Sequence, residues 1–436
     1  MVNQDGLEWV QETFGLEPHW TEDPDITILT QIAHKHLSVP EDGSLQISFF
    51  AQGAFNKLYK VSVPSSDYLM RVSLPVDPHH KTESEVATIE FVRKETEMPV
   101  PRIIAYDSDS GNELGFEWML MEMMPGVPLR KRWRKMSWEA KEEIVRRLVK
   151  YQAQLFEKRF EQIGNIFVQE KEVHDEADRG LVPKERRFIL GRLVSLIFFW
   201  GDHLTHDVPR GPFKSSYDWL HTRLQFILTD QERILKTSDD EDEIEDAEFA
   251  KDLAEKLLQV LPTVFPPDSA EAEPSVLFHD DLSMQNILVD EGGKMTAIID
   301  WECVSALPLW RACQLPELLE GAVRIEKPRK ENYAPESEDE GQDSLSPNVL
   351  DNEGVDELYW DHLLDYERTQ LRKLFVDEMR ATKPDWVATM ETSSLKADFG
   401  QAVHDADNGW RFKIIREWVE AFLTGDVYSL RERMMG

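Results

Sequence analysis

The residues of this chain with the clearest chemical potential lie between His279 and Asp300. The stretch from His279 to Asn286 has the pattern H-x-D-x-x-x-x-N, and Asp300 follows at the end of an apolar run. In phosphoryl transfer, one aspartate orients the attacking hydroxyl, while an asparagine and a second aspartate hold magnesium on the nucleotide phosphates. We therefore predict that Asp281 accepts the hydroxyl proton and that Asn286 and Asp300 bind Mg²⁺.

Two short apolar runs, 287–289 and 295–299, must bring these metal ligands together. The segment between them contains two adjacent glycines, which accept the backbone angles of a tight turn. The pattern predicts a β-hairpin. Because neighbouring strands lie roughly 5 Å apart, Asn286 at its start and Asp300 at its end could both reach one cation through oxygen, as magnesium requires.

A simpler interpretation is that these polar residues are solvated turn residues beside a hairpin. Any one of them alone would favour it, but the full combination with apolar strands on both sides favours a site. We expect His279 to have a structural role, with its imidazole bonded to nearby backbone. The predicted catalytic loop covers residues 279–302.

The amino-terminal third has the pattern of a small β-sheet with one helix, and the rest is mainly helical. Apolar stripes at helical spacing recur in the later part of the chain and predict buried helix faces. The sequence thus predicts an α+β, two-lobed fold: a small antiparallel sheet lobe with one main helix, and a larger, mostly helical lobe. Strands are expected at 45–50, 58–63, 68–72, 103–105 and 118–124, a helix at 81–94, and helical stripes near 144–155, 217–227 and 363–375.

In such a fold the nucleotide lies between the lobes, and we expect five residues to hold it. Arg71 lies mid-strand among apolar residues and Glu85 follows in the helix, so the pair could bind ATP phosphates. The alternative for Arg71 is an edge-strand position facing solvent. Backbone N–H groups near Gly53 could cover the phosphates, and the backbone at Glu122 and Met124 could bond the adenine edge.

Length and charge restrict the function classes. The chain has 436 residues, enough for one large two-lobed domain or two domains, and a formal net charge of −34. Such a charge argues against nucleic acid and anionic membrane as partners. It favours a cationic small-molecule acceptor, although solubility alone explains it equally well. With two cysteines and no visible targeting signal, we expect a cytoplasmic protein.

The expected organisation has three parts. Residues 1–44 are expected to form an amino-terminal helical extension, 45–124 the nucleotide-binding lobe, and 125–436 the helical lobe. Within the last part, the run of carboxylates at 237–248 predicts a solvated acidic loop. The Pro-, Ser- and acid-rich stretch 327–357 predicts a disordered insert.

Several of these segments resemble the aminoglycoside phosphotransferase family, and more narrowly its large fungal-type branch, which is similar to choline and homoserine kinases. The resemblance implies a protein-kinase-like fold, the cofactors ATP and Mg²⁺, Asp281 as the catalytic residue, Asn286 and Asp300 as metal ligands, and Arg71 with Glu85 as the phosphate-binding pair. It extends from about residue 48 to about residue 321. The segments that carry it are 71–75, 81–88, 99–101, 115–119, 121–126, 279–286 and 299–302.

The chain departs from the family pattern at two places. Asp280 stands where the commoner form of the family motif has glycine. The positively charged residue of the predicted strand 68–72 is Arg71, where the family has lysine. Asp280, as a second carboxylate beside the base, could bind an acceptor amine. Glu302, close to the metal site, is the other candidate for such a contact.

We predict a MgATP-dependent phosphotransferase that acts on a hydroxyl of a small metabolite, for which a cationic compound is one option. The alternative is a nucleotide-binding pseudoenzyme or scaffold. A protein kinase ranks lower, although Ala-Pro-Glu at 334–336 follows Asp300 at a suitable distance. Asp300 is followed by Trp301-Glu302 and not by Phe-Gly. The sequence leaves the acceptor and the oligomeric state open.

Overall fold

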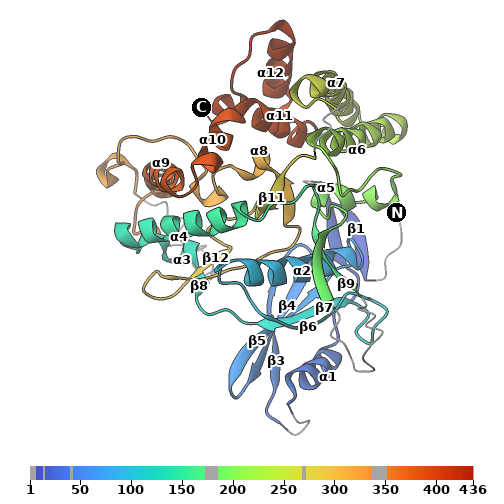
Figure 1. Cartoon of the computed structure of the whole chain (residues 1–436), viewed down its shortest axis with the longest axis vertical. Helices are drawn as coiled ribbons and strands as arrows, with labels where there is room; N and C mark the ends of the chain where they lie inside the picture. The colour runs from blue at the N-terminus through green and yellow to red at the C-terminus, as the bar shows by residue number, and fades with distance from the viewer. Residues whose placement is uncertain are drawn as a thin grey trace, which may run out of the picture.

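A computed structural model describes residues 6–12, 15–39, 43–171, 185–267, 272–335 and 351–435. It has two lobes (Figure 1): an antiparallel sheet with its helices at one end, and a larger assembly of helices at the other. This confirms the predicted α+β, protein-kinase-like fold. None of the described helices is long and apolar enough to cross a membrane.

The sheet of the amino-terminal lobe matches the predicted strands closely. Its five strands are ordered β3-β4-β5-β7-β6, and every neighbouring pair is antiparallel. In β4 buried and half-buried side chains alternate, as the period-two pattern predicts, whereas β7 is buried along almost its whole length. The elements are β3 (Gln46–Gln52), β4 (Asn56–Val63), β5 (Ser66–Ser73), α2 (His80–Glu95), β6 (Ile103–Asp107) and β7 (Glu117–Glu122).

The structure corrects the prediction that residues 1–44 form a helical extension. They contain one helix, α1 (Ile26–Leu37), but also a hairpin of β1 (Leu7–Glu12) and β2 (Gly15–Trp20). The hairpin forms because alternate apolar side chains find partners in the other lobe: Trp9 packs against Trp200, with ring centroids 5.1 Å apart.

The helical lobe holds most of the apolar core. The predicted stripes lie on α4, α6 and α9, and buried side chains from these helices join two large clusters. Its helices are α3 (Leu129–Trp133), α4 (Trp138–Phe156), α5 (Leu196–Phe199), α6 (Ser216–Thr237), α7 (Glu241–Val264), α8 (Leu309–Ala312), α9 (Glu357–Thr382), α10 (Pro384–Thr392), α11 (Ser394–His404), α12 (Phe412–Thr424) and α13 (Leu430–Met435), with 3₁₀ turns at His203–Thr205, Glu317–Leu319 and Lys330–Asn332.

Short strands also run through this lobe. They form β8 (Val127–Pro128), β9 (Ile166–Lys171), β10 (Glu185–Leu190), β11 (Ser275–Phe278), β12 (Ile287–Val289), β13 (Met295–Ile298) and β14 (Ser305–Pro308). The β9–β10 hairpin was not expected in a helical lobe. It lies beside α2 of the other lobe, where Phe188 packs edge-on against Phe91.

The predicted acidic loop at 237–248 is wrong for most of its length, because α7 begins within it. Asp240 is the N-cap, and its carboxylate accepts hydrogen bonds from the backbone amides of Asp242 and Glu243. Carboxylates stabilise the positive end of a helix dipole, which offsets their mutual repulsion. A run of acids therefore begins a helix here.

The predicted disordered insert 327–357 is only partly testable, since residues 336–350 lie outside the described residues. The flanks on either side are structured, which corrects the prediction there. Pro335 pairs with Val355 in an isolated bridge, and buried Asn352 accepts hydrogen bonds from Arg134 and from the Trp360 indole. Ala334-Pro335 therefore does not open an apolar helix of the kind that ends a protein-kinase activation segment.

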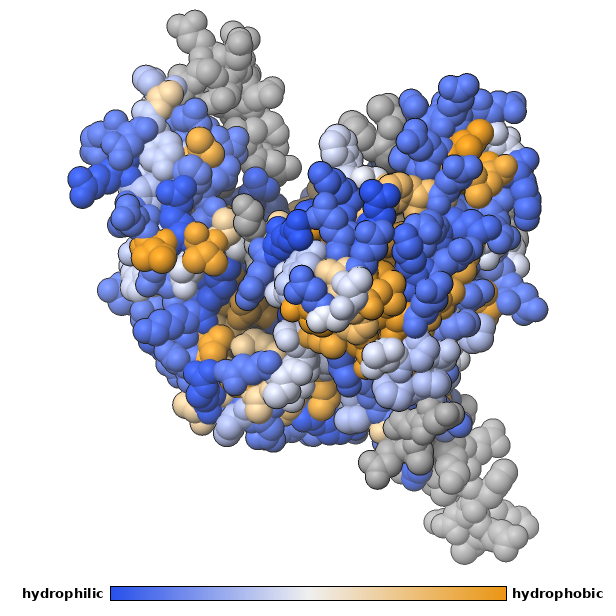
Figure 2. Space-filling view, turned by 90° about the horizontal axis from the view of Figure 1, so that it is seen from above, coloured by the Kyte–Doolittle hydropathy of each residue, from blue (hydrophilic) through white to orange (hydrophobic). Residues whose placement is uncertain are grey.

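The surface agrees with the acidic composition. Figure 2 shows a largely hydrophilic face, on which hydrophobic residues gather around the central hollow. With 83 acidic and 49 basic residues, an excess of negative charge must lie on such a surface.

Candidate active site

The predicted hairpin brings the two proposed metal ligands to one end. β12 pairs antiparallel with β13, Ile287 opposite Ile298, and the Ile299 amide donates to the Asn286 carbonyl at 2.9 Å. Asn286 and Asp300 therefore flank the same end of the ladder. Asp300 has a positive φ of 65°, a backbone conformation that costs energy and is often found at functional sites.

Asn286 also fixes the predicted base. Its side-chain nitrogen donates to the Asp281 carboxylate at 2.9 Å and to the Asp281 carbonyl at 3.0 Å. With its nitrogen so engaged, the amide oxygen of Asn286 is left as an acceptor. Together with the half-buried Asp300 carboxylate, this oxygen forms a hard donor set that fits Mg²⁺.

His279 has the structural position that was expected. Its Nε2 lies 3.2 Å from the Ile299 carbonyl, and its ring packs edge-on against Trp301 with centroids 4.9 Å apart. Trp301 is buried and donates its indole N–H to the Ile298 carbonyl. These contacts tie the loop that carries Asp281 to the end of the hairpin.

Arg71 and Glu85 form the predicted pair. The Arg71 Nη1 to Glu85 Oε1 distance is 2.5 Å, and both side chains are buried. Arg71 lies on β5, between β4 and β7, which excludes a solvent-facing edge position. Its Nη2 is 3.7 Å from the Asp300 carboxylate, so the pair lies beside the metal ligands. Burial raises the pKa of Glu85 to about 7, although the Arg71 charge opposes the shift.

Glu302 has different partners from the predicted acceptor amine. Its Oε2 accepts hydrogen bonds from Arg71, from Lys81 at 2.7 Å and from Asn56 at 2.9 Å. Burial alone would raise the pKa of Glu302, but the charges of Lys81 and Arg71 outweigh it and lower the pKa to about 2. Glu302 is therefore ionised, and it connects the two lobes because its partners Arg71 and Asn56 lie on the amino-terminal sheet.

Lys81 and Asn56 were missed by the sequence analysis. Lys81 is only 1% exposed, and its ammonium also donates to the side-chain amide oxygen of Asn56 at 3.3 Å. A lysine four residues before Glu85 in the first turn of the predicted helix was a usable signal. Its burial, however, follows from the approach of Glu302 in the tertiary structure.

The remaining nucleotide candidates lie in connecting segments. The Gly53 amide donates to the Asn56 carbonyl at 2.9 Å, which closes the turn between β3 and β4. The Glu122 amide is engaged by the Arg102 carbonyl, whereas Met124 has no backbone hydrogen bond within the described residues. Among the described residues, no hydrogen bond or ion pair joins Gly53, Glu122 or Met124 to the catalytic loop. Their roles in nucleotide binding therefore stay predictions.

A cleft of about 460 Å³ opens at the catalytic loop. It is lined by Asp280, Asp281, Asp300 and Glu302, whereas Asn286, the other predicted metal ligand of this loop, is not among its lining residues. Phe55 lines it from the amino-terminal lobe. The helical lobe contributes Ser195, Leu196, Ile197, Trp219, Arg223, Arg311 and His404.

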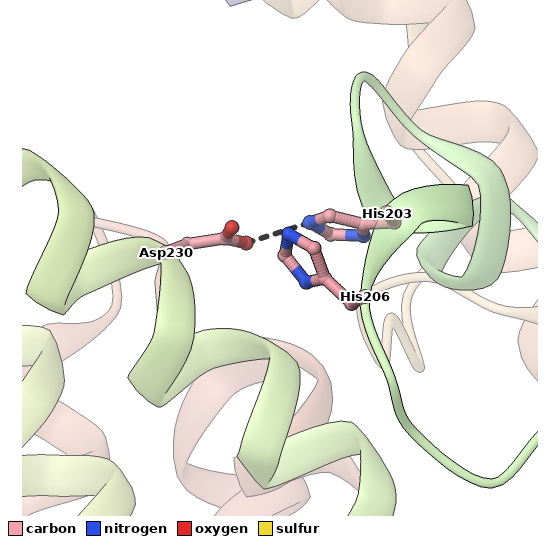
Figure 3. Close-up of side chains that lie close together, drawn as sticks. All are labelled: His203, His206 and Asp230. Atoms are coloured by element: carbon pink, nitrogen blue, oxygen red, sulfur yellow. Dashed lines mark hydrogen bonds and ion pairs between the residues drawn. The ribbon is translucent and has the colours of Figure 1, made fainter. Parts of the chain in front are cut away.

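The residues that the helical lobe contributes to the cleft form what we call its helical wall. A second cluster of polar side chains lies next to this wall, where His203 contacts Ile197. His203, His206 and Asp230 offer ligand atoms within 4.8 Å of one another, and Asp230 points toward both imidazoles (Figure 3). His203 Nε2 lies 2.8 Å from the Asp230 carboxylate, and its Nδ1 is 2.6 Å from the Ile197 carbonyl. A protonated His203 satisfies both contacts, and so the ion pair fixes the segment after α5 against α6.

The chain belongs to the phosphotransferase enzyme family, whose model matches residues 46–310, more than half of the sequence. It is thus a member of a family of kinase-type phosphotransferases, as the resemblance implied.

Its curated relatives include a subtelomeric hrmA-associated cluster protein of Aspergillus fumigatus, 25% identical over 315 residues that cover 63% of this chain and 61% of the relative. Another is the mitochondrial altered inheritance of mitochondria protein 9 of Candida tropicalis, 27% identical over 146 residues, or 31% of this chain and 23% of the relative. The chain thus spans less than two thirds of the length of either relative.

Similar solved structures include aminoglycoside phosphotransferase APH(4)-Ia, with 13% identity and a TM-score of 0.43 over 91% of this chain and 99% of that one. A second is the GDP complex of an aminoglycoside 2′-phosphotransferase-IIIa variant, with 14% identity and a TM-score of 0.39 over 87% of this chain and all of that one.

Proposed function

We propose that this protein transfers the γ-phosphoryl group of MgATP to a hydroxyl of a small metabolite. One observation carries the proposal. Asn286 holds the carboxylate of Asp281 beside the end of the β12–β13 hairpin, where Asp300 lies within 3.7 Å of the Arg71–Glu85 pair. A proposed base, two oxygen ligands and a phosphate-binding cation thereby lie close together at this end of the hairpin, as phosphoryl transfer requires.

The residues divide the work as follows. Asp281 orients the acceptor hydroxyl and accepts its proton as the new phosphate ester forms. Asn286 and Asp300 would hold Mg²⁺, which neutralises charge on the transferring group when bound. Arg71 offers a forked donor suited to phosphate oxygens, and Glu85 and Glu302 keep it in place. The backbone of Met124, which has no backbone hydrogen bond to any residue that the structure describes, would bond the adenine edge.

Two substitutions test the proposal. Asp281→Asn should lower turnover by roughly 10²- to 10⁴-fold, since the base is lost, while nucleotide binding persists. Asp300→Ala should instead abolish the magnesium-dependent part of nucleotide binding. Both effects can be measured by thermal shift and isothermal titration with ATP, with and without Mg²⁺, and by ATP consumption with a panel of alcohols.

The outcomes separate the proposal from its rivals. Unchanged turnover in both variants would contradict it. Absence of any MgATP binding by the unmodified protein would favour a scaffold, and nucleotide binding with no acceptor turned over would favour a pseudoenzyme. Asp290→Asn, in the turn of the same hairpin and outside the cleft lining, is a matched control that should leave nucleotide binding unchanged.

A further inference from the structure

The helical wall of the cleft carries two arginines. Arg223 lies on α6 and Arg311 on α8, and both line the cavity that also contains Asp281 and Asp300. His404, the last residue of α11, lies beside them, with its Nδ1 3.2 Å from Arg223 Nη2.

Neither guanidinium has a carboxylate within ion-pair distance among the residues that the structure describes. The Arg223 Nε is buried without a hydrogen-bond partner, and so is the indole N–H of Trp219 one helical turn earlier. The Arg311 guanidinium lies over the Phe278 ring, with its Cζ 5.1 Å from the ring centroid. In a chain with 83 acidic residues, two neighbouring arginines without a paired carboxylate need a reason.

The electrostatics of this wall are unfavourable in the absence of a ligand. Burial, and then the charge of Arg311, lower the pKa of Arg223 to about 10. Burial likewise lowers the pKa of Arg311. Carboxylates beyond ion-pair distance oppose these shifts without cancelling them: Asp405 and Asp407 for Arg223, and Asp280 and Glu320 for Arg311. Half-buried like charges of this kind mark a binding site more often than a structural element.

We propose that the acceptor carries an anionic group, a carboxylate or a phosphate ester, that Arg223 and Arg311 bind while its hydroxyl lies at Asp281. This inference rests on the proposed function and names its substrate class. Guanidinium forks match the oxygens of both anions, and charge-assisted hydrogen bonds of this kind are the strong ones. Arg223 and Arg311 both line the cleft, so their guanidinium groups would donate to such an anion, whereas the unpartnered Nε of Arg223 and Nε1 of Trp219 are themselves buried.

The fold holds this anion site at a set distance from the base. β11 leads into the loop that carries Asp281, and its antiparallel partner β14 leads directly into α8 with Arg311. On the other side, the His203–Asp230 ion pair anchors α6, the helix that carries Arg223 (Figure 3). Acceptors should therefore be selected by the separation between their hydroxyl and their anion.

The helical side of the cleft carries positive charge, unlike the chain as a whole. A net charge of −34 favours a cationic acceptor at long range, and carboxylates of the catalytic loop line another part of the cleft. An ammonium beside Arg223 and Arg311, however, would meet two guanidinium groups that have no described carboxylate within ion-pair distance. Asp280, which the sequence analysis considered as a contact for an acceptor amine, lines the same cleft. Its charge raises the pKa of Arg311, so it limits the positive potential of the wall.

The first test measures binding and needs no turnover. Inorganic phosphate should bind saturably to the unmodified protein in the presence of MgADP, and Arg223→Gln or Arg311→Gln should weaken it by at least about 10-fold. MgADP affinity should not change. Arg146→Gln is the matched control, because Arg146 lies on α4, paired with Glu142 and Glu378 away from the cleft.

Two results would overturn the inference. One is equal phosphate affinity in the unmodified protein and both variants; the other is a loss of nucleotide affinity instead, which would place the arginines in the nucleotide site. Should the glutamine variants fail to fold, Arg223→Lys and Arg311→Lys are the alternatives, because lysine keeps the positive charge but lacks the paired N–H donors of a guanidinium group. They should bind phosphate more weakly than the unmodified protein.

The second test identifies the anion. ATP consumption is compared for glycerate, glycerol 3-phosphate, glycerol and ethanolamine, which offer a carboxylate, a phosphate, no charge and a cation beside a hydroxyl. We expect activity with glycerate or glycerol 3-phosphate, lost in Arg311→Gln, and whichever is used decides between the two sources. A preference for ethanolamine would contradict the inference. Inactivity with all four bears on the proposed function, while the phosphate measurement still decides the anion site.

Discussion

At the scale of single residues, the site depends on charges that neutralise one another across the two lobes. Arg71 contacts Glu85 and Glu302, and Glu302 also contacts Lys81. Each of these side chains is buried or nearly so, and Arg71 and Glu302 each contact two of the others, so the loss of either of these two would be costly. The network therefore couples the position of Arg71 to that of Asp300, 3.7 Å away.

Glu85→Gln tests this coupling. Because burial already raises the pKa of Glu85 to about 7, the neutral amide resembles a form that the folded protein tolerates, and the free energy of unfolding should change little. The weaker hold on Arg71 should lower kcat/KM for ATP roughly 10- to 100-fold. Glu83→Gln, an exposed residue on the same helix, is the control. Equal kinetics in the two variants would remove Glu85 from the site.

At the scale of elements, the connection between the lobes depends on a close backbone approach. Gly126 precedes β8, which pairs with β12 of the catalytic hairpin. Its φ is +111°, and a Cβ there would lie 2.7 Å from the Val289 carbonyl oxygen and from Thr296 Oγ1. Only glycine fits both the angle and the space.

Gly126→Ala should therefore destabilise the protein by roughly 1–3 kcal/mol. Gly292→Ala lies in the turn of the neighbouring hairpin and has no positive φ in that range. A Cβ there would lie 3.4 Å from Asp290 Oδ1, an ordinary contact, so its effect should stay within about 0.5 kcal/mol. Urea unfolding followed by tryptophan fluorescence measures both. A Gly126→Ala midpoint as high as that of Gly292→Ala would show that the backbone there can relax.

At the scale of the whole molecule, a buried ion pair joins the lobes. Asp77, just before α2, is 2% exposed and lies 3.0 Å from Arg192, which follows β10. Burial raises the pKa of Asp77 from 3.8 to about 6, although Arg192 and Arg210 oppose the shift. The folded protein thus holds a proton that the unfolded chain has lost between these two values, so stability contributed by this group falls as pH rises through that range.

Asp77→Asn removes this dependence. Relative to the unmodified protein, the variant should gain about 1 kcal/mol in the free energy of unfolding between pH 5 and pH 7.5. The difference between the two proteins isolates Asp77 from the other carboxylates. Asp377→Asn, at an exposed position on α9, should show no such gain. If the difference in free energy of unfolding between Asp77→Asn and the unmodified protein does not change with pH, then Arg192 fully compensates for the burial of Asp77.

Local sequence determined much of this protein. The strands 46–122, the helix α2 and the β12–β13 hairpin follow from apolar periodicity and glycine turns, which act between near neighbours in the chain. For the same reason Asp281, Asn286 and Asp300 could be placed together before any tertiary contact was known. The start of α7 shows the opposite case, where helix capping prevailed over a run of like charges.

Only the tertiary structure decided what surrounds that motif. Arg71 and Glu302 are 231 positions apart in the chain, and no local pattern announces that their side chains will meet. The same holds for Arg223, Arg311 and His404, which three separate helices bring to one cleft. Periodicity indicates which face of an element is buried but not which element covers it. The sequence therefore specified the motif, and the packing of the lobes determined the charges that surround it.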